Sequence, residues 1–186
     1  MTQGRSADRQ LVAVHIRTGD CYQSSAPLIP NSSSSAACGG RKRDNRVPDQ
    51  HNWNTFFECL LDRAQNASGT KRLSFFIATD WPPAVTLARA HLPHVLTAAS
   101  VGDVGHIGFD SSSAALMRLL TDFAVLSHSD LPYAGRSSLG LLAAQASGLP
   151  YIRYGFSKDG HFAGEDFACP TRAGRASPLW FAPIAG

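Results

Sequence analysis

Residues 11–20 of the chain are LVAVHIRTGD, and this stretch decides the fold class. It opens with small and β-branched apolar residues, which is typical of a short strand buried on both faces of a sheet. The pattern then breaks into polar residues at His15, Arg17 and Asp20. In an open α/β sheet the carboxyl ends of the strands face the ligand crevice, where an arginine offers a planar fork of donors suited to phosphate. The stretch therefore predicts an anion site at the tip of the first strand, with a polar surface turn as the alternative.

Strand and helix patterns alternate along the rest of the chain. Short apolar runs predict further strands at residues 73–78, 94–97, 131–134 and 149–154. Helices are predicted between them at residues 52–64, 82–91, 116–126 and 137–147, from apolar spacing, a Pro-Pro start or a serine N-cap. The third of these helices is marked by an apolar stripe of Leu116, Leu119, Leu120, Phe123 and Leu126. Such alternation implies a parallel sheet, so we expect a Rossmann-like α/β domain over residues 11–154 with helices on both faces.

Two segments fall outside this pattern. Residues 21–50 are rich in Ser, Pro, Asn, Gly and Arg, which is typical of long insertions that are either functional or disordered, and we expect disorder. Residues 155–186 have no periodicity and are expected to form an irregular C-terminal tail.

The bulk composition fits one globular domain and excludes few functions. The chain has 186 residues, of which 44% are hydrophobic and 17% charged, and its net charge is +3. No basic face carries interleaved aromatic residues, and much of the positive charge gathers at residues 41–46 within the insertion. A nucleic-acid partner is therefore not expected.

Several sequence features bear on the cellular compartment of the protein. The four cysteines lie far apart without a CxxC pair, which argues against zinc and allows up to two disulfides in a lumenal protein; they are Cys21, Cys38, Cys59 and Cys169. Acceptor sequons for N-glycosylation begin at Asn31 and Asn66. The chain shows no signal peptide and no membrane-spanning run. Either the protein is cytosolic, or this chain lacks the N-terminal part that carries its targeting signal.

Polar residues follow three of the predicted strands. The groups are His15, Arg17 and Asp20; Thr79 and Asp80; and Arg136, Ser137 and Ser138. Because the carboxyl ends of parallel strands share one edge of the sheet, we expect the three groups to converge. The third group also opens a helix, whose free N–H groups and positive dipole end favour phosphate. Arg17 and this helix start together predict a diphosphate cradle, with capping and turn chemistry as the alternative for Ser137 and Asp80.

Three motifs resemble those of the GDP-fucose-dependent fucosyltransferases, the superfamily of α1,6-, α1,2- and protein O-fucosyltransferases. VHIRTGD at residues 14–20 is similar to the family's His-x-Arg-x-x-Asp motif, and FIATD at 76–80 to its second segment. Residues 121–138 resemble the third segment, in which an aspartate on a helix precedes a Ser-Ser pair; here Asp122 lies 16 residues before Ser138. The resemblance spans residues 11–154 and implies the C-terminal, donor-binding half of a GT-B fold.

The resemblance implies a role for individual residues. His15 and Asp122 would recognise the guanine and ribose of GDP-fucose, and a carboxylate can accept from both N1–H and N2–H of guanine. Without the resemblance, Asp122 is expected to be a solvated helix residue. Arg17 would hold the β-phosphate and stabilise charge on the departing GDP. Ser138, with Ser137 and the helix amides, would hold the same phosphate.

The implied activity is transfer of fucose from GDP-fucose to a hydroxyl of a glycan or glycoprotein acceptor, with inversion. Arg17 and the helix dipole would take the place of a metal, and the chain has no DxD-like motif, so no metal cofactor is expected. The resemblance also implies the Golgi or ER lumen, with membrane attachment only through an N-terminal anchor that this chain does not contain.

The chain departs from the α1,6 branch at three positions. Cys21, Ser25 and Leu139 stand where that branch has a lysine, a glutamate proposed as base, and a glutamine. These departures leave no base that the motif names. The nearest carboxylate is Asp20, the motif's own aspartate, which in the family looks more structural than catalytic. Two alternatives stay open: a non-catalytic nucleotide- or glycan-binding module, as in a truncated or degenerate transferase, and a glycosyltransferase that uses another nucleotide sugar.

Overall fold

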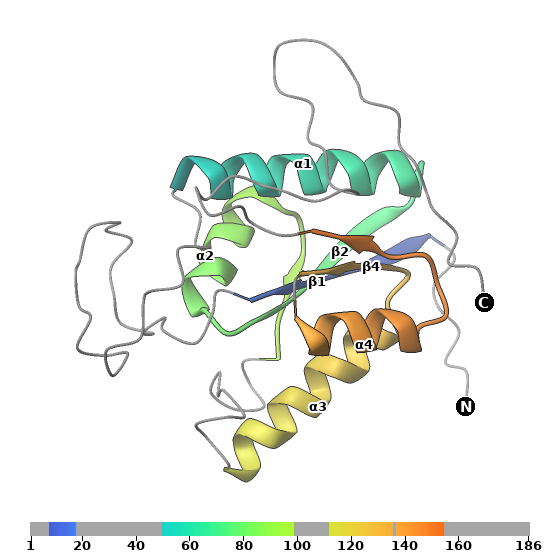
Figure 1. Ribbon diagram of the computed structural model, residues 1–186. Helices are drawn as coiled ribbons and strands as arrows, with labels where there is room; N and C mark the ends of the chain where they lie inside the picture. Colours follow the sequence, from blue (N-terminus) through green and yellow to red (C-terminus); the bar gives the residue numbers. More distant parts are fainter. Residues whose placement is uncertain (1–7, 18–49, 99–111, 136, 155–186) are drawn as a thin grey trace.

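The computed structural model describes residues 8–17, 50–98, 112–135 and 137–154. These residues form a five-stranded parallel sheet with helices on both faces (Figure 1), which confirms the Rossmann-like α/β prediction. The strands are β1 (Arg9–Ile16), β2 (Arg72–Thr79), β3 (Val95–Leu96), β4 (Leu131–Ala134) and β5 (Ile152–Arg153). The helices are α1 (Gln50–Ser68), α2 (Pro82–His91), α3 (Ser113–Ser127) and α4 (Ser138–Ala146).

The order of the strands places a change of direction at the centre of the sheet. The order is β3-β2-β1-β4-β5, so the chain first builds outward from β1 and then returns to its other side with β4. In β1 and β2, Ile16 pairs with Thr79, while His15 pairs with Ala134 of β4. The C-terminal ends of β1 and β4 therefore flank the topological switch point, where open α/β sheets bind their ligands.

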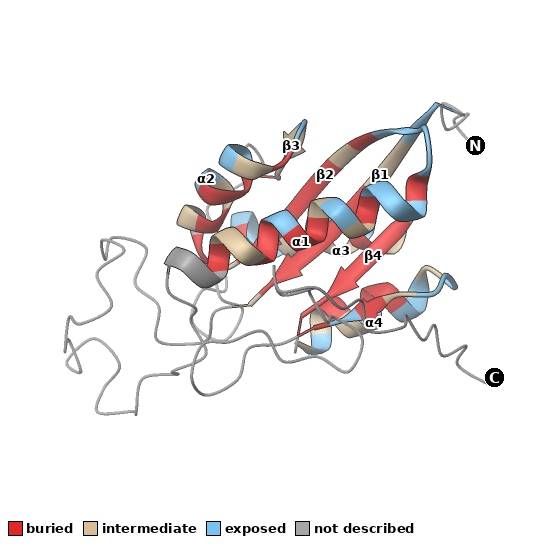
Figure 2. Cartoon of the chain, turned by 90° about the horizontal axis from the view of Figure 1, so that it is seen from above, coloured by how far each residue is buried: buried red, intermediate tan, exposed pale blue. Residues whose placement is uncertain are grey.

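The helices bury two separate cores against the sheet. The first core lies under α1 and α2 and is largely aromatic and aliphatic, with Trp53, Phe56 and Phe57 at helical spacing on α1. The rings of Trp53 and Phe57 stack at 5.8 Å. The second core lies under α3 and α4 and is built from smaller side chains, such as Ala13, Ala78 and Ala143, beside Phe76 and Leu126. Figure 2 shows the inward face of α1 and the central strands buried, and the outward face of α1 exposed.

The buried face of α3 differs from the stripe expected from the sequence. Leu116 and Leu120 are 50% and 51% exposed, so their place in the stripe is wrong. The buried residues of this helix are Ala115, Arg118, Asp122 and Leu126. Nearly all faces of α3 carry apolar residues, so the apolar pattern alone does not fix which face meets the sheet. Packing against the small side chains of the second core decides it.

The domain boundaries expected from the sequence are only partly covered by the described residues. β1 begins at Arg9, two residues before the expected start, and α1 begins at Gln50, the last residue of the expected insertion. The rest of the 21–50 insertion and the 155–186 tail lie outside the described residues. None of the described helices is both long and apolar enough to cross a membrane.

Candidate functional site

The tip of β1 places His15 at the switch point, inside the protein. Val14 and Ile16 belong to the first core, and because side chains alternate along a strand, the ring of His15 lies on the opposite face, toward α4. His15 is only 6% exposed. Its Nδ1 atom has no hydrogen-bond partner within the part of the chain that the structure describes. Burial, with a further contribution from the charge of Arg17, lowers the pKa of His15 to about 4, so the ring is neutral at pH 7.

A glycine on α4 makes room for this ring. A Cβ atom added at Gly140 would lie 2.8 Å from His15 Nδ1, closer than real Cβ contacts allow, and 3.0 Å from its Cγ. Gly140 is the third residue of α4, so Nδ1 of His15 faces the first turn of that helix. A buried, neutral donor or acceptor thus lies against the positive end of a helix dipole.

The backbone of β1 and β4 is held together directly below this ring. The His15 carbonyl accepts hydrogen bonds from the Gly135 N–H, at 3.2 Å, and from the Tyr154 hydroxyl. A Cβ at Gly135 would lie 2.7 Å from the same carbonyl oxygen, so this position requires glycine. Burial first, and then the charge of Asp80, raise the pKa of Tyr154, which therefore stays a neutral donor. Tyr154 was not foreseen, since a tyrosine after a short strand has no distinguishing pattern.

Arg17 is paired with Asp80 across the tips of β1 and β2. Arg17 and Asp80 directly follow Ile16 and Thr79, the last paired residues of β1 and β2, and Arg17 Nε lies 3.4 Å from Asp80 Oδ2. Thr79 Oγ1 accepts from the Trp81 N–H at 3.0 Å, which fixes the turn that follows β2. The Arg17 side chain is 30% exposed, so it combines a defined position with access to solvent. Two of the three polar groups expected at this edge therefore meet.

The third polar group lies at the start of α4. Ser137 occupies the N-cap position, as expected, but its side chain makes no capping hydrogen bond. Its N–H donates to the Gly135 carbonyl at 2.7 Å, and its carbonyl accepts the first helical bond from Leu141. The N–H groups of the first turn, from Ser138 onward, have no acceptor within the helix. Asp20 and Arg136, the other members of the predicted groups, lie outside the described residues.

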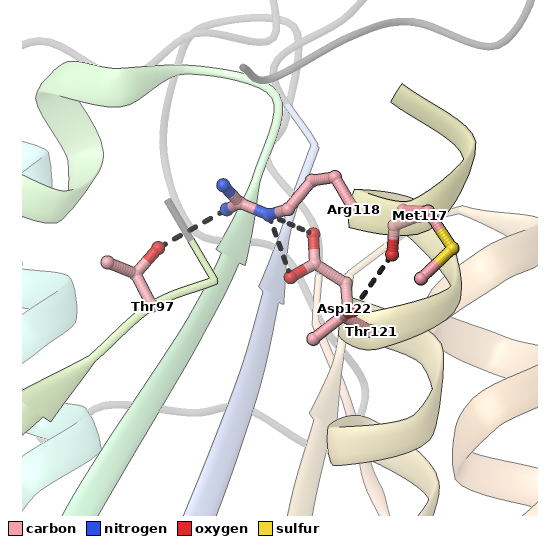
Figure 3. Close-up of polar contacts among 5 residues, drawn as sticks. All are labelled: Thr97, Met117, Arg118, Thr121 and Asp122. Carbon is pink, nitrogen blue, oxygen red and sulfur yellow. Dashed lines mark hydrogen bonds and ion pairs between the residues drawn. The ribbon is translucent and has the colours of Figure 1, made fainter. Parts of the chain in front are cut away.

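Asp122 is buried on α3 rather than solvated, so its interpretation as a solvated residue is wrong. It is 7% exposed and accepts hydrogen bonds from Arg118 Nε at 3.1 Å on both carboxylate oxygens. Arg118 Nη2 also donates to Thr97 Oγ1 at 3.2 Å, as Figure 3 shows. Burial raises the pKa of Asp122 to about 6, and the charge and hydrogen bond of Arg118 oppose that rise.

Asp122 and His15 lie on the same side of the sheet. α3 packs against β1, which carries His15, and against α4, whose Gly140 lies against the His15 ring. Thr97 directly follows β3, so the Arg118 guanidinium that it binds lies at the C-terminal edge of the sheet. Arg118 was missed from the sequence. The available signal was its place one helical turn before Asp122, on the same face of α3.

The comparisons with known proteins add a distant likeness of fold. No protein-family model and no curated protein matches the sequence. The chain is similar to crystal structures of the α-1,6-fucosyltransferase NodZ soaked with GDP-fucose, of NodZ from Bradyrhizobium, and of NodZ co-crystallised with GDP. In each case the identity is 16% and the TM-score 0.44, over 84% of this chain. The chain spans 42% of the length of the first of these structures, less than half.

The fold and the site together define a class rather than an activity. The chain is a Rossmann-like α/β domain with a polar edge at its switch point, and its likeness to fucosyltransferase structures is distant. Within the described residues no group of three or more His, Cys, Asp or Glu side chains could hold a metal ion.

Proposed function

We propose that this chain is the GDP-sugar-binding domain of a fucosyltransferase-like protein, which transfers fucose from GDP-fucose to a hydroxyl of a glycan or protein. The observation that carries the proposal is the arrangement at the switch point. There the buried Nδ1 of His15 faces the start of α4, and Arg17 lies on the same sheet edge, held by Asp80. The motif resemblance of the sequence supports the same assignment.

The diphosphate is assigned to Arg17 and the first turn of α4. Asp80 limits the orientations of the Arg17 guanidinium, which reduces the entropy lost when a phosphate binds. The first-turn N–H groups and the Ser138 hydroxyl supply further donors from the opposite side. Charge-assisted hydrogen bonds of this kind contribute roughly 1.5–3 kcal/mol each.

The base and ribose are assigned to Asp122 and His15. An ionised carboxylate can accept from the neighbouring N1–H and N2–H groups of guanine, whereas uracil presents a single N–H between two carbonyls. His15 is neutral, so it offers one donor and one acceptor nitrogen and adds no charge beside the phosphates.

In the proposed reaction the acceptor hydroxyl attacks the anomeric carbon as the bond from that carbon to the β-phosphate oxygen breaks. The electron pair of that bond leaves with GDP, and the configuration inverts. Arg17 and the α4 dipole stabilise the charge that grows on the leaving phosphate, which accelerates the step only insofar as these contacts strengthen in the transition state. The hydroxyl proton passes to a base, for which Asp20 is the candidate as the nearest carboxylate. The proposal includes no metal ion.

The test is calorimetric titration with GDP and with UDP. GDP should bind and UDP should bind at least tenfold more weakly, because only guanine satisfies Asp122. Absence of GDP binding, or equal affinity for the two nucleotides, would contradict the donor assignment.

A non-catalytic module is the second candidate, and Cys21, Ser25 and Leu139 favour it because they replace the side chains of the α1,6 branch. Release of GDP from GDP-fucose separates the two candidates. A transferase consumes the donor at a rate that depends on Arg17, whereas a module binds GDP-fucose and leaves it intact.

We also propose that the protein folds in the lumen of the secretory pathway. Cys59 on α1 is disulfide-bonded, and disulfides persist in oxidising compartments. Asn66, in the last turn of α1, is exposed and begins an Asn-Ala-Ser sequon. Protein expressed through a secretory pathway should lose one glycan's mass in Asn66→Gln, relative to the wild type. Four reactive thiols, counted after the purified protein is unfolded without a reducing agent, would contradict the proposal.

A further inference from the structure

Arg118 is buried in a way that requires explanation. The residue is 3% exposed, and arginine is almost never fully buried unless it is paired. It lies on the sheet-facing side of α3, one turn before Asp122, and binds both oxygens of that carboxylate through Nε. Its Nη2 binds Thr97 Oγ1, after β3 (Figure 3). The guanidinium thus connects α3 to the C-terminal edge of the sheet.

The geometry leaves Asp122 able to bind more donors. A carboxylate has about four acceptor positions, and the two bonds from Arg118 Nε use one on each oxygen. Among the residues that the structure describes, no other donor takes the second position on either oxygen. Arg118 Nε lies 3.1 Å from both oxygens and so occupies the side between them, and the remaining positions point outward from each oxygen. The adjacent N1–H and N2–H donors of guanine would therefore converge on one oxygen of Asp122 rather than bridge the two.

We propose that Arg118 is a positioning residue for base recognition, which anchors the Asp122 carboxylate at the ligand edge and keeps it charged so that it accepts from guanine. This inference rests on the proposed function, because it assigns a residue to the base end of the same site. Arg118 acts through Asp122 and needs no contact with the nucleotide.

The electrostatics of the surrounding elements support a specific role for Arg118. Burial raises the pKa of Asp122 to about 6, and Arg118 is the charge that opposes the rise. On β1 the nearest ionisable side chain of that sheet face is His15, which is neutral above about pH 4. Beyond the strand tips Arg17 is paired with Asp80. α4, with the sequence SLGLLAAQA, has no ionisable side chain.

Loss of the guanidinium therefore has a predictable effect. Without it the pKa of Asp122 rises further, and the side chain becomes a neutral acid near pH 7. A protonated carboxyl carries an O–H group, which is a donor and cannot pair with the N–H donors of guanine.

The test compares Arg118→Met with Arg118→Lys by calorimetry, with GDP and with inosine diphosphate (IDP), which lacks the 2-amino group. In the wild type, GDP affinity should fall below about pH 6, as Asp122 takes up a proton. In Arg118→Met the fall should begin at least one pH unit higher, with at least a tenfold loss of GDP affinity at pH 7. The wild-type preference for GDP over IDP should shrink at that pH. Arg118→Lys retains the charge and should bring the pH profile back toward the wild type.

A pH profile and a GDP-to-IDP ratio that are unchanged in a folded Arg118→Met would overturn the inference. If that variant does not fold, Thr97→Val removes only the anchor of the guanidinium and should still lower the GDP-to-IDP ratio; an unchanged ratio there would overturn the inference as well.

A carboxyl NMR titration of the free protein keeps the two proposals apart. Asp122 should titrate near pH 6 in the wild type and at higher pH in Arg118→Met, which removes the opposing charge. Absence of GDP binding in the wild type would defeat the proposed function. If GDP binds and Asp122 titrates at the same pH in the wild type and in Arg118→Met, the inference alone is defeated.

Discussion

At the scale of single residues, two ionisable groups are buried on one face of the sheet with opposite consequences for charge. His15 is held neutral and Asp122 resists ionisation, both mainly because burial disfavours the charged form. The place of His15 and Arg17 at a strand tip could be predicted, because an apolar run that ends in polar residues is a local signal. The partners Arg118 and Tyr154 could not, since each is defined by a contact with a distant part of the fold.

The two buried groups predict opposing effects of pH on stability. The pKa of His15 falls from 6.5 to about 4 on folding, so stability from this residue is complete above about pH 6.5 and is lost as the pH falls toward 4. The pKa of Asp122 rises from 3.8 to about 6, so stability from this residue is present below pH 3.8 and is lost as the pH rises through 6. Each shift corresponds to about 3 kcal/mol at full extent.

Between pH 4 and 6 these contributions nearly cancel in the wild type. The free energy of unfolding of His15→Gln should therefore fall with rising pH, relative to the wild type, and that of Asp122→Asn should increase with it. Urea unfolding at several pH values measures both slopes. Parallel curves for wild type and His15→Gln would show that His15 is not held neutral.

At the scale of elements, local signals fixed the types of helix and strand but not the faces that they bury. The prolines at the start of α2 and Gly148 after α4, with a φ of 65°, mark the helix ends where the structure has them. α3 is different, because apolar residues surround most of its circumference and its burial is decided by the sheet. The sequence pattern therefore misplaced Leu116 and Leu120, and left Arg118 out of account.

Because of the contact between α4 and β1, one Gly→Ala substitution should lower the free energy of unfolding instead of raising it. Gly→Ala in a helix normally stabilises by about 0.5–1 kcal/mol. At Gly140 the new Cβ would collide with His15, so Gly140→Ala should destabilise by about 1–3 kcal/mol. In a His15→Ala background the same substitution should become neutral or stabilising. A destabilisation of equal size in both backgrounds, measured by denaturant unfolding, would show that the ring is not the obstacle.

The face that α3 buries against the sheet gives a further prediction with a matched control. Leu126 is 2% exposed in the second core, so Leu126→Ala should cost about 2–5 kcal/mol. Leu120 is 51% exposed on the same helix, and Leu120→Ala should change the free energy of unfolding by less than about 0.5 kcal/mol. Similar losses for the two variants would support the stripe expected from the sequence instead.

At the scale of the whole molecule, the strand order β3-β2-β1-β4-β5 is what creates a site. The alternation of strands and helices predicts a parallel sheet, and a shared C-terminal edge follows from that. The alternation does not predict which strands are neighbours, because pairing joins segments that are distant in sequence, such as β1 and β4. Only the observed order places the tip of β1 and the start of α4 on either side of the switch point.

The central claim is that this edge binds the diphosphate of a GDP-sugar through Arg17. The most direct measurement is the GDP affinity of Arg17→Ala by calorimetry, with Arg72→Ala as the control. Arg72 is exposed at the start of β2, at the opposite edge of the sheet. We predict at least a tenfold loss of GDP affinity in Arg17→Ala, corresponding to about 1.4 kcal/mol or more, and wild-type affinity in Arg72→Ala. Equal affinity in both variants, or equal loss in both, would contradict a diphosphate site at this edge.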